Sequence, residues 1–360
     1  MKHCQWIGRA ALAAALLFSA PLGISAAHAA DGEERAPWIV GSTLMNPLTI
    51  EVFKHLKQRA PQLPDPRIDS RGTSKGITDF CAGTGADTPD VVAMSRRMRG
   101  GEFETCTKHG VADIIEIQLG IEALVLTVSA RDEDFALTFD TLYRAIAAEL
   151  PESEEFLPNA AETWNDVDKS LPKTRISVIL PSSALGARGF FDNRFLQGAC
   201  REMHAFKNIF EADERVRQCT NLRKDGHVTE LGVPYDTLAV KALENAPRGT
   251  VAIMPLRFAL DAGDKLKMLR FETTIPNREN VSTREYIGTR PIYYYVKRAH
   301  VKDYNGVGLV PGLREFITEV TRESTFGDDG YLVPFGLVSM PERKRAEVRD
   351  AALRLKPMVR

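Results

Sequence analysis

The stretch RIDSRGTSKGITDFC, from Arg67 to Cys81, joins a short apolar–polar run to a helix-like pattern through a turn of small residues. The turn holds two glycines, small hydroxyls and the cations Arg71 and Lys75. Glycine lets a ligand approach the backbone, and the first turn of a helix carries unpaired N–H groups and a partial positive charge. The stretch therefore predicts a strand, a tight turn and a helix whose start can hold an anion.

Two further segments share this design, VGSTLMNP at 40–47 and LPSSALGARG at 180–189. For any one of the three, helix capping and ordinary turn formation explain the same residues. The spacing of a Walker A loop is absent from SRGTSKG. Three such turns in one chain favour an anion site that needs no metal.

Strands and helices alternate along the rest of the chain. Buried strands are predicted at 90–95, 112–120, 123–130, 249–256 and 291–297, and amphipathic helices at 138–150, 312–323 and 339–356. This alternation predicts an α/β fold with mostly parallel sheets. In such sheets ligands bind beyond the carboxyl ends of the strands.

The first 29 residues have the pattern of a secretory signal peptide. Lys2 and Arg9 precede an apolar run at 10–20, and Ala27-His28-Ala29 resembles a cleavage site. The alternative is an N-terminal membrane anchor, but the apolar run is short for a membrane span. We therefore expect cleavage near Ala30 and export to the periplasm.

The formal charge of the whole chain is −1 at pH 7, with 47 basic and 48 acidic residues. A chain without a strong positive field is a poor partner for nucleic acid. We therefore expect no nucleic-acid binding.

The chain has five cysteines, of which Cys4 lies in the predicted leader. The other four form two pairs that are close in sequence, and an even number in an exported protein indicates disulfides. We predict the bonds Cys81–Cys106 and Cys200–Cys219. A metal site is the alternative, although no C-x-x-C or H-x-x-x-H spacing is present.

Several segments resemble the PstS-like periplasmic binding proteins, the phosphate-binding components of bacterial phosphate transporters. GSTLMNP resembles the family's first ligand-binding turn, and GTSKGITDFCAG its second. DVVAMSRRMRGGEFETC resembles the family's D-I-x-x-A-S-R segment with its downstream cysteine. Later landmarks are LRKDGHVTELG, TRPIYYYVKRAHV and GLREFITEVTRESTFGDDGYLVPFGLVSMP. The order of these motifs over most of the chain carries the resemblance.

The resemblance implies a two-lobed type II periplasmic binding protein with two crossover strands. Lobe 1 would comprise residues 36–127 plus 292–360, and lobe 2 residues 128–291. The crossovers would lie near 124–129 and 291–296.

The resemblance also implies the ligand-binding residues. Those of the first and second turns are Ser42, Thr43, Leu44, Thr73 and Ser74. Arg96 stands where many relatives have the Asp that accepts the proton of hydrogen phosphate, and a subgroup has Arg there. We expect Arg96 to bind the anion directly, with a surface cation as the alternative.

The third turn departs from the family pattern. The S-G-T turn of the family becomes Leu185-Gly186-Ala187, which has no hydroxyl. The residue that is usually an arginine before this turn is Pro181. We expect Gly186 and Arg188 to take over this part of the site, with Ser182 or Ser183 as the alternative.

The expected function is capture of phosphate or a related oxyanion in an interlobe cleft, by a monomer that delivers it to an ABC transporter permease. No cofactor, metal or catalytic residue is expected. A relative that has lost transport and acts as a scaffold, adhesion or signalling protein is the main alternative.

A secreted phosphatase is a further alternative, but no G-x-S-x-G or H-E-x-x-H motif is present. Four histidines are expected at the surface or in turns rather than in a catalytic role, namely His109, His204, His227 and His300. The sequence leaves the identity of the anion open.

Overall fold

The computed structural model describes residues 35–359 apart from 154, 184, 233–234 and 302–309. The predicted leader, residues 1–29, lies outside the described residues. Within them, no helix combines the length and the apolar character that crossing a bilayer requires.

The first part of the described chain consists of strand–turn–helix units. Its elements are β1 (Trp38–Gly41), η1 (Thr43–Met45), α1 (Asn46–Arg59), β2 (Arg67–Asp69), α2 (Thr73–Phe80), β3 (Val91–Met94), α3 (Gly100–Lys108) and β4 (Ile114–Ser129). Helix α2 therefore begins at the small residues of the RGTSKG turn, as predicted.

The middle part contains many short elements. They are β5 (Ala136–Leu137), α4 (Phe139–Ile146), β6 (Glu149–Glu152), β7 (Glu155–Pro158), α5 (Trp164–Val167), β8 (Ser177–Pro181), α6 (Gly186–Phe191), η2 (Asp192–Leu196), α7 (Gln197–Glu202), α8 (His204–Lys207), α9 (Ala212–Thr220), β9 (Val228–Leu231), α10 (Tyr235–Asn245) and β10 (Thr250–Pro255). The helix predicted at 138–150 ends at Ile146, because residues 149–152 pair with β7 as strand β6.

The last part returns to the first sheet. Its elements are α11 (Leu256–Asp261), η3 (Gly263–Lys265), β11 (Leu266–Met268), β12 (Arg270–Phe271), α12 (Arg278–Ser282), β13 (Thr289–Lys297), α13 (Arg298–Val301), α14 (Leu313–Val320), α15 (Glu323–Phe326), η4 (Val333–Phe335) and α16 (Glu342–Leu353). The terminal helix predicted at 339–356 is thus present as α16.

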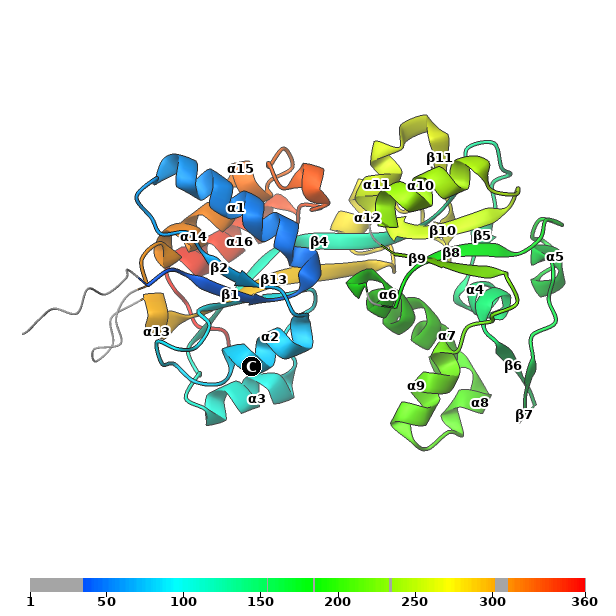
Figure 1. Cartoon of the computed structure of the whole chain (residues 1–360), viewed down its shortest axis with the longest axis horizontal. Helices are drawn as coiled ribbons and strands as arrows, with labels where there is room; N and C mark the ends of the chain where they lie inside the picture. Colours follow the sequence, from blue (N-terminus) through cyan, green and yellow to red (C-terminus); the bar gives the residue numbers. More distant parts are fainter. Residues whose placement is uncertain (1–34, 154, 184, 233–234, 302–309, 360) are drawn as a thin grey trace, which may run out of the picture. The chain divides into compact units, whose positions relative to one another are not determined.

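One sheet path runs through the whole fold in the order β2-β1-β3-β13-β4-β10-β8-β9, with β11 paired to β4. Strand β1 is parallel to β2 and β3, and β8 is parallel to β9 and β10. The two parallel groups are joined by antiparallel β13 and β4, which lie side by side between them (Figure 1).

Strand β4 is a single strand of 16 residues, whereas the sequence predicted two strands, 112–120 and 123–130. Gly120 lies inside this strand. A Cβ at this position would overlap the side chain of Leu337, so the glycine makes room for the segment that bridges to Ile121. The first half of β4 pairs with β13, and its second half with β10 and β11.

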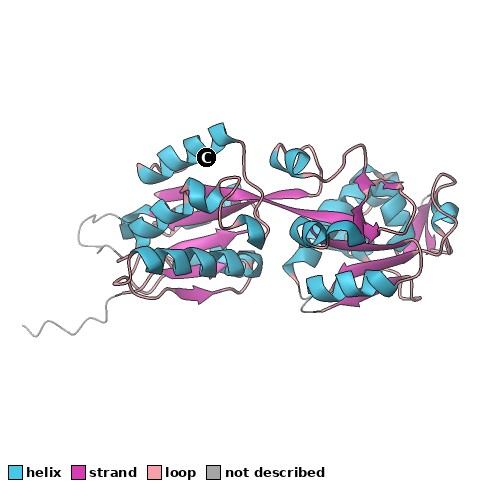
Figure 2. Ribbon diagram, turned by 90° about the horizontal axis from the view of Figure 1, so that it is seen from above, coloured by secondary structure: helices cyan, strands magenta, loops and turns pink. Residues whose placement is uncertain are grey.

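Helices lie on either side of the strands (Figure 2). On one side of β1 and β3, residues of α2 such as Ile77 and Phe80 form a buried cluster with Val40 and Val92. The main core contains Phe53 of α1 and Phe316 of α14, whose rings stack with centroids 5.1 Å apart. Covering both faces of a sheet is what nearly continuous apolar strands require.

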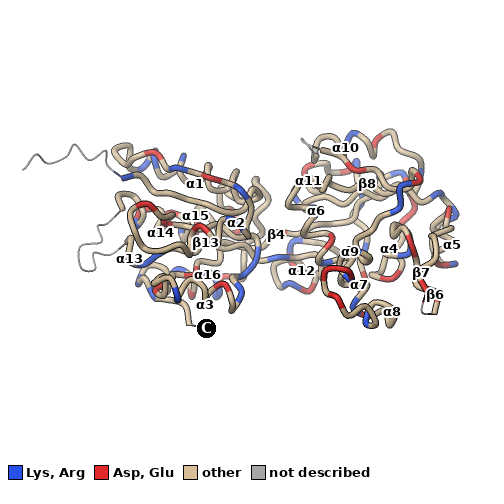
Figure 3. The backbone as a smooth tube through the Cα atoms, turned by 60° about the horizontal axis from the view of Figure 1, so that its bottom comes forward, with Lys and Arg blue, Asp and Glu red and all other residues tan. Residues whose placement is uncertain are grey.

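Both predicted disulfides are confirmed. Cys81–Cys106 joins the end of α2 to α3, and Cys200–Cys219 joins α7 to α9. The residues from Arg35 onward form one compact unit, so the lobe limits 36–127 plus 292–360 and 128–291 stay predictions. Acidic and basic positions are interspersed along the described backbone (Figure 3).

Candidate functional site

The first small-residue turn follows β1 and is held against the end of β3. The backbone N–H of Ser42 donates to the carbonyl of Ala93 over 2.9 Å, and Ser42 is buried. Gly41 has a φ of 128°, and any Cβ there would overlap the backbone of Ala93. The glycine is therefore required for the close approach that brings the first turn to the carboxyl end of β3.

The second turn packs directly against the first. The N–H of Gly72 donates to the carbonyl of Gly41 over 2.8 Å, and Gly76 in α2 approaches Gly41 so closely that a Cβ would overlap it. The hydroxyls of Thr73 and Ser95 share a hydrogen bond of 3.2 Å. The ends of β1 and β3 and the start of α2 therefore meet at one place.

This region gathers hydroxyl groups with the start of an eight-residue helix. Ser42, Thr43, Thr73 and Ser74 were predicted from the sequence, and Ser74 is exposed on the first turn of α2. Ser95 was missed, although it directly follows the buried run of β3. Hydroxyl donors and helix N–H groups are the chemistry that holds an oxyanion without a metal.

Arg96 follows Ser95 but already has a carboxylate partner. Its guanidinium makes two hydrogen bonds to Glu102, of 2.8 and 2.5 Å. Burial opposes ionisation of Glu102, but hydrogen bonds from Arg96 and from the N–H of Arg99 outweigh it and lower the pKa of Glu102. Arg96 is therefore a neutralised cation in this structure.

The third turn meets the first turn. A Cβ on Gly186 would lie 3.3 Å from the Leu44 side chain and 3.6 Å from the Thr43 hydroxyl. Two of the predicted turns therefore contribute residues that are close in space.

Arg188 is 6% exposed and is also held by carboxylates. Its Nε donates to Asp192 over 2.7 Å, and its Nη1 donates to Glu230 over 2.5 Å. Burial opposes the charge of Arg188, but these hydrogen bonds outweigh it and raise the pKa of its guanidinium. Burial also raises the pKa of Asp192. Arg188 is thus committed to two acidic partners.

Thr43 and Leu44 line a cavity of about 230 Å³. Its other lining residues include Glu122, Arg257 and Ile292. The described lining does not include five of the predicted site residues, namely Thr73, Ser74, Arg96, Gly186 and Arg188. The structure therefore places the predicted residues in neighbouring turns but does not bring all of them into this one cavity.

Glu122 is paired with Arg290, which the sequence did not single out. The two residues are register partners on β4 and β13, and Arg290 Nε donates to Glu122 over 2.8 Å. The Arg290 guanidinium also lies over the Phe190 ring, 4.4 Å from its centroid. No motif marked this pair, because it forms only when the two crossover strands align.

Comparison with protein families supplies the affiliation. A family model described as a PBP superfamily domain matches residues 30–324 of this chain. This chain belongs to the PBP superfamily.

Similar proteins agree with this membership. A phosphate-binding protein PstS of Staphylococcus epidermidis RP62A is 23% identical over 314 residues, covering 84% of this chain and 82% of the relative. A crystal structure of a possible phosphate binding protein from Planctomyces limnophilus matches with a TM-score of 0.63 and 17% identity, covering 89% of this chain and 98% of that one.

An ABC-type phosphate transport receptor from Vibrio cholerae matches with a TM-score of 0.57 and 16% identity, covering 85% of this chain and 100% of the other. At such identities the structural likeness establishes the fold. The predicted α/β fold of the type II periplasmic binding proteins is therefore confirmed for this PBP superfamily member, with β4 and β13 as its crossover strands.

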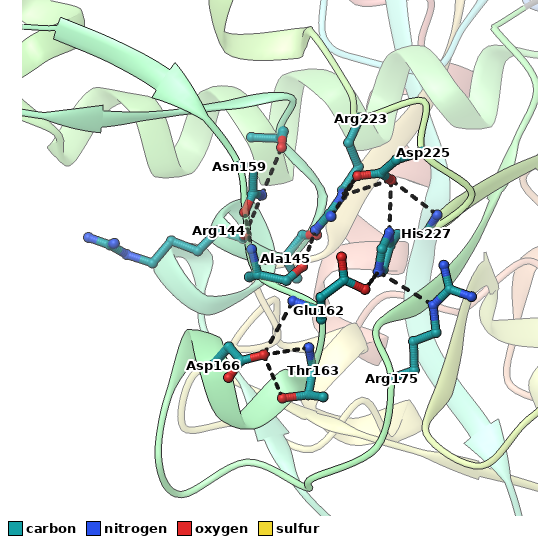
Figure 4. A network of polar contacts seen from close by, with 12 residues as sticks. Arg144, Ala145, Asn159, Glu162, Thr163, Asp166, Arg175, Arg223, Asp225 and His227 are labelled. Carbon is teal, nitrogen blue, oxygen red and sulfur yellow. Dashed lines mark hydrogen bonds and ion pairs between the residues drawn. The ribbon is translucent and has the colours of Figure 1, made fainter.

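Two of the four histidines expected at the surface or in turns of this PBP superfamily member are buried. His227 is 2% exposed and lies between Asp225, 2.8 Å from Nδ1, and Glu162, 3.2 Å from Nε2 (Figure 4). His300 is fully buried and lies 2.5 Å from Asp90. The expectation was wrong for His300, which lies in helix α13, whereas His227 lies in the bend before β9. Carboxylate partners compensate the cost of burying both imidazoles.

The His227 network ties separate segments together. Arg223 binds Asp225 and also donates to the carbonyls of Ala145 and Ala161 (Figure 4). Among the described partners of His227 none is a hydroxyl or a thiol. The geometry of this network is that of a structural clamp.

Proposed function

We propose that this chain is a solute-binding protein that captures phosphate or a related small oxyanion. The observation that carries the proposal is the meeting of the first two glycine-containing turns, where Thr73 and Ser95 share a hydrogen bond at the start of α2. Two of the relatives are named as a phosphate-binding protein and a phosphate transport receptor. Capture requires hydrogen-bond donors around an anion and no chemical step.

The bound anion would lie in a cleft between the two predicted lobes. Closure would remove water from the anion and strengthen the hydrogen bonds that hold it. The contact of Gly186 with Thr43 and Leu44 supports this placement, since it joins a turn of predicted lobe 2 to one of predicted lobe 1. We infer export to the periplasm as a monomer and delivery to an ABC transporter permease.

The test is isothermal titration of the mature protein, unfolded and refolded to remove bound ligand. Phosphate, sulfate and glycerol 3-phosphate are titrated separately. We expect phosphate to bind with a micromolar or lower Kd. No heat with any of the three anions from a folded sample would refute the proposal.

A matched pair of variants locates the site. Thr73→Val removes the hydroxyl next to Ser95, and we expect phosphate affinity to fall about tenfold, as for loss of a hydrogen bond to a charged group. Thr78→Val on the same helix removes a hydroxyl that binds the Ser74 carbonyl, and it should leave affinity unchanged. Equal losses in both variants would show that the effect is not local.

One observation favours a second candidate function, in which the protein keeps the fold but no longer binds an anion for transport. Both predicted cations, Arg96 and Arg188, are bound to carboxylates of the chain itself. Arg96→Ala with Arg97→Ala as its control separates the two functions, because Arg97 is paired with Glu116 and was not assigned to the ligand. Weaker phosphate binding in Arg96→Ala alone supports capture.

A further inference from the structure

A second concave region lies among α7, α8 and α9, outside the small-residue turns. Its volume is about 490 Å³, within the range of pockets that hold small organic ligands. The lining residues are Gln197, Cys200, Arg201, Phe206, Lys207, Ala212, Arg215, Val216 and Cys219. We call this region the helical pocket.

The helical pocket is lined by three cations and no carboxylate. Arg201 donates to the carbonyl of Asn193 over 3.3 Å, and Arg215 to that of Ile209 over 2.7 Å. Within the described chain, Arg201, Lys207 and Arg215 form no ion pair with an acidic side chain. No described carboxylate therefore lies within ion-pair distance of these three cations.

Acidic residues of the same helices lie elsewhere. Glu202, next to Arg201 in α7, lines a separate cavity of about 700 Å³ together with Asp140 and Glu272. On α9, Glu214 is paired with Arg217, which does not line the helical pocket. Helix α7 thus separates an acidic cavity from a basic one.

One pocket residue, Arg201, acts electrostatically on the nearby Arg194. Burial is the main cause that lowers the pKa of Arg194, and the charge of Arg201 lowers it further. An anion in the pocket would relieve this repulsion.

The floor of the helical pocket is apolar. Phe206 is buried, and the Cys200–Cys219 disulfide fixes α7 against α9. Val216, which is 40% exposed, and the exposed Ala212 supply the apolar surface that a ligand in the pocket can reach. A rigid apolar floor next to cations without a carboxylate partner suits a ligand with an apolar part and an anionic head.

We propose that the helical pocket binds a small organic anion that carries an apolar group, such as a medium-chain fatty carboxylate. The carboxylate would lie among Arg201, Lys207 and Arg215. The alkyl chain would cover Ala212 and Val216, the exposed apolar residues of the lining. This site is separate from the oxyanion site proposed above, and neither depends on the other.

Isothermal titration with sodium decanoate tests the proposal, with decyltrimethylammonium as a probe that has the same chain and the opposite charge. We expect decanoate to bind one-to-one and the ammonium probe at least tenfold more weakly. Saturating inorganic phosphate should leave decanoate binding unchanged. Equal binding of both probes, or displacement of decanoate by phosphate, would overturn the proposal.

Variants assign the binding to the pocket. The triple change Arg201→Gln, Lys207→Gln and Arg215→Gln should weaken decanoate binding at least tenfold. The response to phosphate should be the same in this variant as in the wild type. Arg217→Gln is the matched control, since this arginine of α9 is paired with Glu214 outside the pocket. Val216→Glu places a carboxylate on the apolar floor and should abolish decanoate binding. Undiminished binding in the triple variant would refute the assignment.

Discussion

At the scale of single residues, Glu102 and the proposed phosphate ligand would both bind the guanidinium of Arg96. Glu102 accepts two hydrogen bonds from Arg96 and one from the N–H of Arg99. A partly exposed pair of this kind contributes about 0.2–1 kcal/mol. A bound phosphate would compete with Glu102 for the same guanidinium.

Glu102→Gln should therefore strengthen phosphate binding. The amide can still accept the hydrogen bond from Arg99, but it no longer neutralises Arg96. We expect about two- to fivefold tighter binding at low salt, measured by titration calorimetry. Glu104→Gln, at an exposed position of the same helix, is the control. Unchanged or weaker binding in Glu102→Gln would show that Arg96 serves the structure only.

Lys297 is a buried cation in the final residue of β13. Burial lowers the pKa of its ammonium to about 7, although the nearby Asp90 charge opposes the shift. Its Nζ donates to the Thr88 hydroxyl over 2.8 Å and lies 5.0 Å from the centroid of the Phe80 ring. The folded state thus favours the neutral amine over a pH range in which the unfolded chain is protonated.

This difference makes stability rise with pH between about 7 and 10.5, because the unfolded state then binds one more proton than the folded state. The expected slope is up to about 1.4 kcal/mol per pH unit. Below pH 7 the Lys297 side chain is protonated in both the folded and the unfolded state, so it no longer makes stability depend on pH. Lys297→Met should abolish the slope in urea unfolding from pH 7.5 to 9.5. A slope equal to that of the wild type would contradict the assignment.

At the scale of elements, α2 reaches its place through contact between two glycines. Gly76 in α2 lies against Gly41 at the end of β1, and the Gly72 N–H donates to the Gly41 carbonyl. Side chains at either glycine would separate the helix start from the end of the strand. The Cys81–Cys106 disulfide then fastens the other end of α2 to α3.

Gly76→Ala should destabilise the protein by about 2 kcal/mol or more, because its Cβ overlaps backbone atoms that cannot move freely. Phosphate affinity should fall as well, since the Thr73–Ser95 arrangement depends on this contact. Gly101→Ala in α3 meets no atom within 4 Å and should be neutral or stabilise by about 0.5–1 kcal/mol. Urea unfolding of both variants compares them directly, and equal effects would contradict the packing argument.

At the scale of the whole molecule, a ligand that binds only the folded state stabilises all of it. At a free phosphate concentration 100 times Kd, the free energy of unfolding should rise by about 2.7 kcal/mol. Thermal unfolding with phosphate, compared with sodium chloride of equal ionic strength, measures this effect. Thr73→Val should need about tenfold more phosphate for the same shift. Equal shifts with chloride would indicate general salt stabilisation.

Much of the fold was predictable because its signals are local. The turn after β1 and the turn before α2 each show glycine, small hydroxyls and a following helical pattern within a few residues. The cysteine pairs are also close in sequence, and both formed as predicted. Strand β4 was predicted as two strands, and the close approach of Leu337 to Gly120, inside the single strand, comes from a segment far away in the sequence.

The contacts around the candidate site were predictable only in part, because they join distant segments. Thr73 is flanked by turn signals, but its hydrogen bond to Ser95 requires β3 to end beside α2. The partners of Arg188 are Asp192, one helical turn away, and Glu230, which arrives only with β9. A sequence shows that a cation is present but does not show which carboxylate it will meet.

The sequence by itself determined the small-residue turns, most of the long buried strands and the two disulfides, since turn chemistry, periodicity and cysteine spacing act over short distances. Tertiary structure alone decided that Arg96 and Arg188 are neutralised, that His227 and His300 are buried, and that Arg290 pairs with Glu122. It also decided that Arg201, Lys207 and Arg215 line one pocket whose lining has no carboxylate. The physical reason is that charge compensation and burial depend on which distant segments pack together.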